Sequence, residues 1–274
     1  MYNTTSSKKI KDYINSLFFV KINNGDIMIY ITGDKHRHFE FVESFCKIHK
    51  TSKNDIMIVL GDAGINYFLN KKDYELKDVL SEFPITLFCI HGNHEERPEN
   101  IDTYKTKLFH DGIVYYEEAY PNILFAKDGE IYDFNGLKTL VIGGAYSRDK
   151  TKRLKLGPKW NYYWYPSEQP SEEIKNRVRK TLIENSNTVN IILSHTCPYK
   201  KIQPESIDYT TDQSTIDYST EYFLDEIEEN TDYDTWYCGH QHIDKHVDRI
   251  RFMHDDIDEF KKLVEKKSIY IKTK

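Results

Sequence analysis

Hydrophobic residues cluster in five short runs along the chain, and each run predicts a β-strand. The runs lie at residues 27–31, 56–60, 85–90, 189–193 and 235–238. The first three are almost continuously apolar, a pattern typical of strands that are buried on both faces of a sheet. We therefore expect these strands inside a layered domain.

The segments between the first three runs have the spacing of amphipathic helices. Residues 39–49 and 74–80 carry apolar side chains at helical intervals, such as Phe41, Phe45 and Ile48 in the first segment. A strand–helix–strand–helix–strand order over residues 27–90 predicts a parallel sheet with right-handed crossovers.

The pattern changes over residues 123–142, where turn signals interrupt the apolar runs. Asp128-Gly129 and Asn135-Gly136 separate these runs, and such dipeptides between apolar segments are typical of hairpins. A second, more antiparallel sheet is the prediction for this region. Beyond it we expect a basic and aromatic loop, then a helix near residue 170, another at 219–230, and the solvated start of a helix at the acidic residues 255–259.

Composition limits the class of protein. The 274 residues, 39% of them hydrophobic, suffice for one domain with a real core, which we place at residues 26–274 behind an extension of residues 1–25. A formal net charge of −6 gives no nucleic-acid signature, and four cysteines without a CxxC pair suit neither a disulfide framework nor a zinc ribbon. No apolar run approaches the roughly 20 residues that span a bilayer. We expect a cytoplasmic protein with no membrane segment and no obligate protein partner.

Metal-binding residue types follow each of the five apolar runs. In chain order they are Asp34 and His36, Asp62, Asn93 and His94, His195, and finally His240 and His242. Because loops at the carboxyl ends of strands converge in α/β sheets, we expect these side chains to meet. Imidazole and carboxylate together suit Zn, Fe and Mn, and one carboxylate can bridge two ions about 3.5–4 Å apart. Each residue alone has a simpler explanation as a turn former or hydrogen-bonded residue, but five coincident strand ends predict a metal site.

The order of these blocks resembles the signature of the calcineurin-like metallophosphoesterase superfamily. The blocks are Asp34-x-His36, Gly61-Asp62, Gly92-Asn93-His94-Glu95, His195 and Gly239-His240-x-His242. The resemblance implies an α/β (α+β) fold of four αββα layers, in which two mixed β-sheets are flanked by helices. It also implies two divalent metal ions, with Mn foremost and Fe, Zn or Ni as alternatives.

The resemblance also implies a role for each residue. One ion would be held by Asp34, His36 and His242, the other by Asn93, His195 and His240, with Asp62 as the bridge. His94 would contact the phosphate and protonate the leaving-group oxygen. A metal-bridging hydroxide would attack phosphorus in line, without a covalent enzyme intermediate.

One position departs from the family pattern. In phosphoprotein phosphatases a second Asp stands three residues after the bridging Asp and supports the histidine, but this chain has Ile65 there. Isoleucine can neither orient His94 nor raise its pKa, so strong general-acid catalysis is in doubt. Glu95 or Asn66 are candidates for orienting His94 instead, and His91 is a candidate for orienting a metal ligand.

Phosphate recognition needs cations or backbone N–H groups beyond the metals. Arg97, close after the His94 motif, and Arg148 are the candidates. Arg148 belongs to a segment, residues 143–160, that mixes glycine, basic and aromatic residues. Such a segment could clamp a phosphate and stack a base, although a solvated surface loop is the simpler interpretation.

We therefore predict a metal-dependent phosphoesterase that favours small phosphodiesters or nucleotides. The enzymatic alternatives are a phosphomonoesterase, including a phosphoprotein phosphatase, and a nuclease acting on single-stranded nucleic-acid ends. A catalytically silent scaffold of the same fold is the non-enzymatic alternative. Retention of all seven implied ligands argues against the scaffold.

Overall fold

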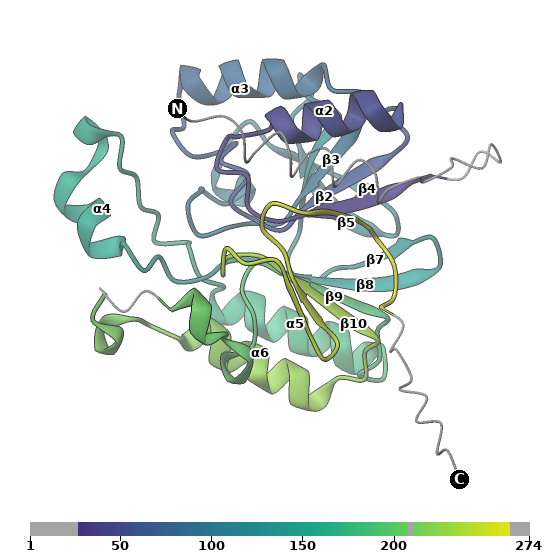
Figure 1. Cartoon of the computed structure of the whole chain (residues 1–274), viewed down its shortest axis with the longest axis vertical. Coiled ribbons are helices and arrows are strands. Elements are labelled where there is room, and N and C mark those ends of the chain that lie inside the picture. The colour runs from purple at the N-terminus through teal and green to yellow at the C-terminus, as the bar shows by residue number, and fades with distance from the viewer. Residues whose placement is uncertain (1–26, 208–210, 264–274) are drawn as a thin grey trace, which may run out of the picture.

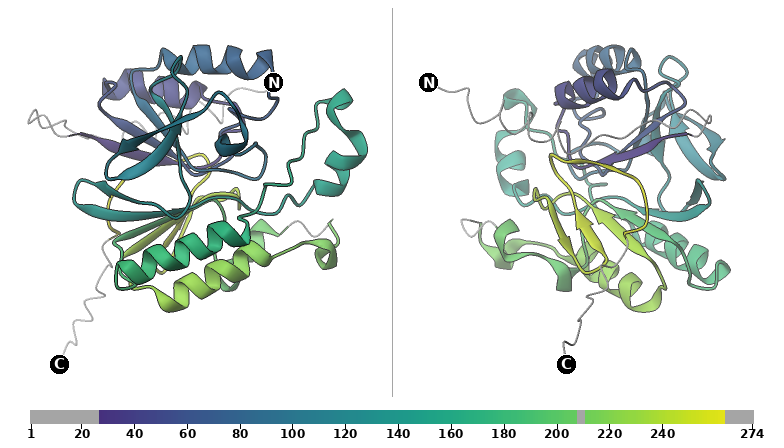
Figure 2. Two further views of the ribbon diagram at one scale, coloured as in Figure 1. Left: turned by 180° about the vertical axis from the view of Figure 1, so that it is seen from behind. Right: turned by 45° about the vertical axis from the view of Figure 1, so that its right-hand side comes forward.

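The computed structural model describes residues 27–207 and 211–263, and these form four layers (Figure 1). Two β-sheets lie in the middle, with helices α2 and α3 outside one sheet and α5 and α6 outside the other (Figure 2). The expected αββα architecture with two mixed sheets is confirmed. The predicted extension, residues 1–25, lies outside the described residues. In the described part of the chain no helix combines the length and apolar character needed to cross a bilayer.

The described strands form one seven-stranded and one six-stranded sheet. The first sheet contains, in spatial order, β13 (Ile257–Glu259), β1 (Ile29–Thr32), β2 (Ile56–Val59), β3 (Thr86–Cys89), β6 (Ile123–Ala126), β5 (Gly112–Tyr116) and β4 (Lys105–Phe109). The second contains β11 (Lys245–Val247), β12 (Ile250–Phe252), β10 (Thr235–Cys238), β9 (Ile191–Ser194), β8 (Leu137–Ile142) and β7 (Ile131–Phe134). The α-helices are α2 (Glu40–His49), α3 (Lys71–Ser81), α4 (Lys150–Leu156), α5 (Glu172–Glu184) and α6 (Ser219–Asn230).

The five predicted strands are present, and their continuous hydrophobicity reflects burial on both faces. Along β1, Ile29 and Ile31 point into the core between the two sheets, while Tyr30 packs with the helices outside. β1, β2 and β3 pair in parallel with one another, as predicted for residues 27–90. In the second sheet, Ile192 and Trp236 face the outer layer, where they pack with apolar residues of α5 and α6. Alternate residues therefore serve two cores, which explains why these strands have no polar face.

The second sheet is less antiparallel than predicted. β8, β9, β10 and β12 run parallel to one another, and only the outer strands β7 and β11 are antiparallel to their neighbours. Asn135-Gly136 makes the predicted hairpin between β7 and β8, with φ of 56° and 81°, which suits a two-residue primed turn. Asp128-Gly129 does not make a hairpin, because β6 belongs to the first sheet and β7 to the second.

The acidic segment at residues 255–259 forms a strand and not the predicted helix start. β13 pairs antiparallel with β1, and two carboxylates of the acidic segment share a buried partner. Asp256 and Asp258 accept hydrogen bonds from the Arg251 guanidinium at 2.6 and 2.8 Å. The predicted loop at 146–170 likewise contains a short helix, α4.

Candidate metal centre

The predicted metal ligands come from both sheets and meet where their strands end. β1, β2 and β3 contribute from the first sheet, and β9 and β10 contribute from the second. The loops are hydrogen-bonded to one another: the backbone N–H of His240 donates to Asp34 across the sandwich at 2.9 Å, and within the first sheet the N–H of His36 donates to the carbonyl of Asp62 at 2.7 Å. The five strand ends are therefore brought together.

Four of the predicted ligands have left-handed backbone conformations. The φ angles are 43° at His36, 46° at Asp62, 60° at His240 and 50° at His242. Such conformations are uncommon for residues with a side chain and concentrate at functional sites. The turns after β1, β2 and β10 therefore share a left-handed backbone conformation at a predicted ligand.

The motif glycines allow these loops to approach one another. A Cβ atom on Gly61 would lie 2.1 Å from Nδ1 of His195, and a Cβ on Gly92 would lie 2.1 Å from Oδ1 of Asp62. A Cβ on Gly239 would lie 2.3 Å from Oδ1 of Asp34. Any side chain at these positions would displace a predicted ligand.

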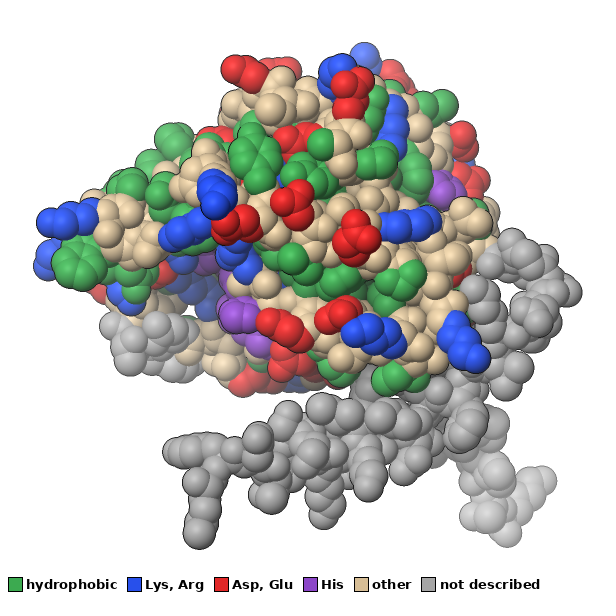
Figure 3. All heavy atoms as spheres, turned by 90° about the horizontal axis from the view of Figure 1, so that it is seen from above, with side chains coloured by type: hydrophobic (Ala, Val, Ile, Leu, Met, Phe, Trp, Pro, Cys, Tyr) green, Lys and Arg blue, Asp and Glu red, His purple; other side chains and the backbone are tan. Residues whose placement is uncertain are grey.

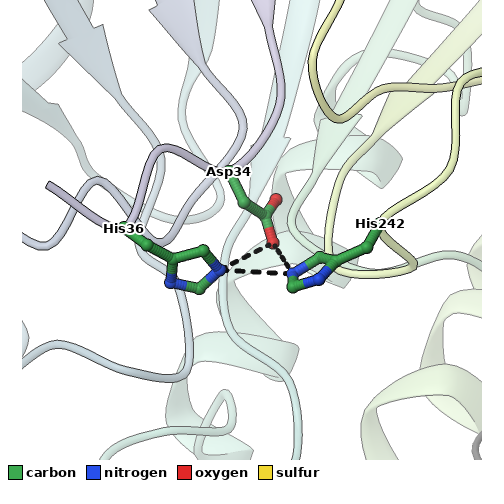
Figure 4. A group of neighbouring side chains, drawn as sticks. All are labelled: Asp34, His36 and His242. Carbon is green, nitrogen blue, oxygen red and sulfur yellow. Dashed lines mark hydrogen bonds and ion pairs between the residues drawn. The ribbon is translucent and has the colours of Figure 1, made fainter. Parts of the chain in front are cut away.

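Asp34, His36 and His242 form one compact group (Figure 4). The two imidazole rings point at the Asp34 carboxylate, with Nε2 of His242 at 3.1 Å and Nε2 of His36 at 3.9 Å from Oδ2. The two Nε2 atoms are 3.2 Å apart. Burial would raise the pKa of Asp34, but the hydrogen bond from His242 lowers it to about 2.

A second group surrounds His195, which is fully buried. Its Nδ1 lies 2.8 Å from the carbonyl oxygen of Leu60, so this nitrogen carries a proton and donates. In the neutral ring Nε2 then has a lone pair, which points at Oδ1 of Asn93, 2.8 Å away. Asn93 is oriented by its amide N–H group, which donates to Oγ of Ser147 at 2.9 Å. Two electron-pair donors thus face each other.

Asp62 lies between the two groups. Its Oδ2 is 3.9 Å from Nδ1 of His36 and 3.8 Å from Nε2 of His195, and its Oδ1 accepts the backbone N–H of His94 at 2.8 Å. Burial opposes ionisation, yet the neighbouring histidines, His94 foremost, hold the pKa of Asp62 well below its usual range. The carboxylate is therefore charged at neutral pH.

This donor set fits divalent metal ions. Asp34 and Asp62 provide two buried carboxylates, and together with His195 they bring ligand atoms within 4.8 Å of one another. The His240 ring centroid lies 5.0 Å from that of His195. A cation would offset the repulsion between the two buried carboxylates. It would also accept the lone pairs of His195 Nε2 and Asn93 Oδ1, which face each other.

His94 lines a cavity of about 210 Å³ next to this group, together with His36, Arg37, Asp62, Gly64, Tyr67 and Arg153. Its Nε2 lies 3.9 Å from Oδ2 of Asp62 and 3.2 Å from Nη2 of Arg153. Guanidinium only donates, so this nitrogen of His94 is the acceptor. Burial lowers the pKa of His94 to about 4; Asp62 opposes this shift and Arg153 adds to it.

The residues predicted to support His94 contact other groups. Glu95 is fully buried and accepts the backbone N–H groups of Gly64 and Gly92 at 3.1 and 3.2 Å, so it braces two of the loops. Burial raises the pKa of Glu95 to about 8. Asn66 accepts a hydrogen bond from the Tyr104 hydroxyl. His91 is buried, and within the described ranges neither of its ring nitrogens has a hydrogen-bond partner.

The two predicted substrate-binding arginines lie outside the lining of this cavity. Arg97 is buried and paired with Asp128 at 2.5 Å, and its Nε donates to the carbonyl of Ser167. Arg148 donates to Gln241 at 2.9 Å and to the carbonyl of Ser206. It thus supports the loop that carries His240 and His242.

Sequence reasoning missed Arg153 and Tyr67 as residues of the cavity. Arg153 was one of several basic residues in a segment interpreted most simply as a solvated loop. The available signal was Asp149, four residues earlier, whose carboxylate accepts from Nε of Arg153 at 2.7 Å. Tyr67 gave no signal, because its contacts with residues 153–163 are long-range.

The calcineurin-like phosphoesterase family model matches residues 27–244 of the chain. The chain therefore belongs to the calcineurin-like phosphoesterase family, whose members are generally metal-dependent phosphoester hydrolases. No curated protein matches the chain.

Solved structures give distant matches. Protein TT1561 of Thermus thermophilus is 16% identical, with a TM-score of 0.42 and coverage of 78% of this chain and 82% of that one. The phosphopantetheinyl hydrolase of Mycobacterium tuberculosis is 14% identical, with a TM-score of 0.39 and coverage of 84% and 88%.

Proposed function

We propose that this protein is a dinuclear metal-dependent phosphoesterase that hydrolyses small phosphodiesters or nucleotides. The observation that carries the proposal is the convergence of buried carboxylates and imidazoles beside a small cavity lined by two arginines. Two bound divalent ions would polarise the phosphoryl group and supply hydroxide near neutral pH.

The proposed assignment gives one ion to Asp34, His36 and His242 and the other to Asn93, His195 and His240, with Asp62 shared. The position of Oδ2 of Asp62, 3.9 Å from His36 and 3.8 Å from His195, supports the shared role. His195 acts as a neutral ligand through Nε2, because its Nδ1–H is held by the Leu60 carbonyl.

The substrate phosphate would occupy the cavity of about 210 Å³. This volume is below the roughly 300–1,000 Å³ of pockets that enclose whole small molecules, so the cavity suits a phosphoryl group whose ester substituents extend outside. His94, held as a hydrogen-bond acceptor by Arg153, is a weak proton donor in this arrangement. Esters with acidic leaving groups need little protonation, which favours diesters of good leaving groups and nucleotides.

The test is hydrolysis of bis-p-nitrophenyl phosphate by protein loaded with Mn, followed by Asp62→Asn. We expect turnover that stops on chelation, and at least about a 1,000-fold loss of kcat in the variant, because the shared ligand would hold both ions in place. Metal analysis should fall from two ions per chain in the wild type to one or none in the variant.

Asp111→Asn is a matched control. Asp111 is exposed and, like Asp62, has a left-handed backbone, with φ of 68°, a conformation that asparagine tolerates. This variant should keep its activity and its metal. Metal-loaded wild type that hydrolyses no member of a panel of phosphate mono- and diesters would refute the proposal, and the ratio of diester to monoester kcat/KM tests the substrate preference.

A further inference from the structure

A projecting segment, residues 149–163, reaches over the cavity from outside the sandwich; we call it the arm. It contains α4, none of whose residues is buried, and it extends from the body beside the sheets (Figure 1). Seen from above, basic and hydrophobic side chains gather on this lobe at the left of Figure 3. The arm is therefore held by a few specific contacts and not by a core of its own.

Those contacts fix the arm to the loop after β2 and to the first turn of α3. The Tyr67 hydroxyl donates to the carbonyl of Asn161 at 2.9 Å, and Nζ of Lys72 donates to the Asn161 side chain at 2.9 Å. The ring of Tyr163 packs edge-on against those of Tyr67 and Phe68, with centroids 5.5 Å apart in both pairs. The arm is thus anchored to Tyr67 and Phe68, which closely follow Asp62 in the chain.

One arm residue, Arg153, points inward to the cavity. Its side chain is 10% exposed. Nε donates to Asp149, Nη1 donates to the Tyr67 hydroxyl and the Tyr163 carbonyl, and Nη2 donates to Nε2 of His94. A guanidinium has five N–H groups, and these contacts use four of them. Among the described residues the fifth, on Nη2, has no partner, and it lies on the nitrogen nearest His94.

Arg37 lines the same cavity, but among the described residues none of its hydrogen bonds goes to His94. Nη1 donates to Asp73 at 2.6 Å and to the carbonyl of Gly64 at 2.7 Å, and Nη2 donates to the carbonyl of Lys72 at 2.6 Å. Its guanidinium also lies over the ring of Phe68. Arg37 therefore ties the loop after β1 to α3, while Arg153 directs a donor at the reaction site.

We propose that Arg153 binds a non-bridging oxygen of the substrate phosphate through Nη2 and at the same time holds the His94 ring in position. The proposal rests on the phosphoesterase function proposed above and adds a substrate-contacting residue that the family motifs do not contain. A planar donor fork suits phosphate oxygens, and negative charge on those oxygens grows in the transition state. The arm thus brings this positive charge to the site from within the same chain.

The first experiment compares Arg153→Ala with Lys155→Ala in Mn-loaded protein. Lys155 is an exposed residue of the same helix, so its variant removes one positive charge from the arm without touching the cavity. We expect kcat for bis-p-nitrophenyl phosphate to fall about 100-fold or more in Arg153→Ala, the size of effect seen when one transition-state donor is removed, and to stay within about twofold in Lys155→Ala. Guanidinium chloride at millimolar concentration should restore part of the lost rate only in Arg153→Ala.

Equilibrium binding gives a readout that is independent of turnover. Inorganic phosphate should bind Mn-loaded Arg153→Ala about tenfold more weakly than wild type or Lys155→Ala, measured by isothermal titration calorimetry. Arg153→Lys, which keeps a charge without the fork, covers the case in which the alanine variant is unstable, and it should show an intermediate affinity and rate.

Three results would overturn the inference. The first is that Arg153→Ala and Lys155→Ala have equal kinetics and equal phosphate affinity. The second is that neither added guanidinium nor the substitution Arg153→Lys recovers the rate lost in Arg153→Ala. The third is that the affinity for phosphate does not depend on Arg153. Failure of the proposed function looks different, because wild type would then hydrolyse no ester while the calorimetric comparison still tests the phosphate contact.

Discussion

The loops that carry the predicted metal ligands and the arm that carries Arg153 are built on different principles. Each of these loops is short and directly follows a buried strand, and the loops after β1, β2, β3 and β10 contain a glycine or a left-handed residue at a close approach. The arm follows β8 at a distance, buries none of the residues of its helix, and is anchored through Tyr67 and Lys72. The ligand loops are fixed by local chain geometry, whereas the arm is fixed by side chains distant in sequence.

This difference has a consequence for how the site tolerates change. A substitution in a ligand loop alters tightly packed backbone and should abolish metal binding together with activity. A substitution in the arm should leave the metal centre intact and change only the handling of the substrate.

The largest effect is expected from Ile65→Asp, which restores the family residue in the loop after β2. Ile65 is fully buried among residues that pack against α2 and α3, so the new carboxylate would be buried in an apolar layer. We expect unfolding in urea to show a loss of at least about 3 kcal/mol, with no gain in activity. Ile65→Val should cost only about 0.5–1.5 kcal/mol. A stable and more active Ile65→Asp would show that this position does face His94.

Gly61→Ala should nearly abolish metal binding and activity. Gly61 has φ of 92°, and its Cβ would collide with the His195 ring. A displacement of about 1 Å in a catalytic group costs about 100-fold in rate, so kcat/KM should fall by at least that factor. Gly136→Ala has a similar φ of 81° with nothing within 4 Å of the new Cβ, and it should cost about 1 kcal/mol of stability without affecting kcat/KM. Equal kinetic losses in the two variants would refute the steric argument.

The same contrast explains what the sequence could predict. The parallel order of β1, β2 and β3 and the convergence of the five strand ends were predicted from patterns within a few residues of each strand, and the αββα layers were predicted from the family resemblance. The hairpin of β4 and β5 went unpredicted, and so did the strand β13, where Arg251 neutralises Asp256 and Asp258. Arg153 was missed because its neighbours His94 and Tyr67 lie 59 and 86 residues away in the chain.

Glu221 of α6 contacts the loop after β9, which carries the predicted ligand His195. This buried carboxyl accepts the Thr196 hydroxyl at 3.0 Å, directly after His195, and its other oxygen has no partner among the described residues. Burial raises its pKa from 4.5 to about 7. The folded state therefore retains a proton that the unfolded state loses, so stability falls as the pH rises from about 4.5 to about 7 and changes no further above that.

Glu221→Gln removes this pH-dependent cost. Relative to wild type, the variant should gain about 2.5 kcal/mol more at pH 8 than at pH 5, since each unit of pKa corresponds to about 1.4 kcal/mol. Urea unfolding at the two pH values measures the difference. Glu229→Gln, an exposed position of the same helix, should show little pH-dependent change. A gain in Glu221→Gln that is the same at both pH values would contradict the raised pKa.

The smallest expected effect belongs to the arm. Tyr67→Phe removes the hydroxyl that joins Nη1 of Arg153 to the carbonyl of Asn161 but keeps the ring that packs on Phe68 and Tyr163. The loss of one such linkage is worth about 1 kcal/mol, so kcat/KM should fall about fivefold while the metal content stays unchanged. Tyr163→Phe should have no such effect, because Arg153 contacts the carbonyl of Tyr163 and not its hydroxyl. If Tyr67→Phe instead lost metal, the contacts of the arm would be needed to hold the ligand loops in place. The contrast between the arm and the ligand loops would then be wrong.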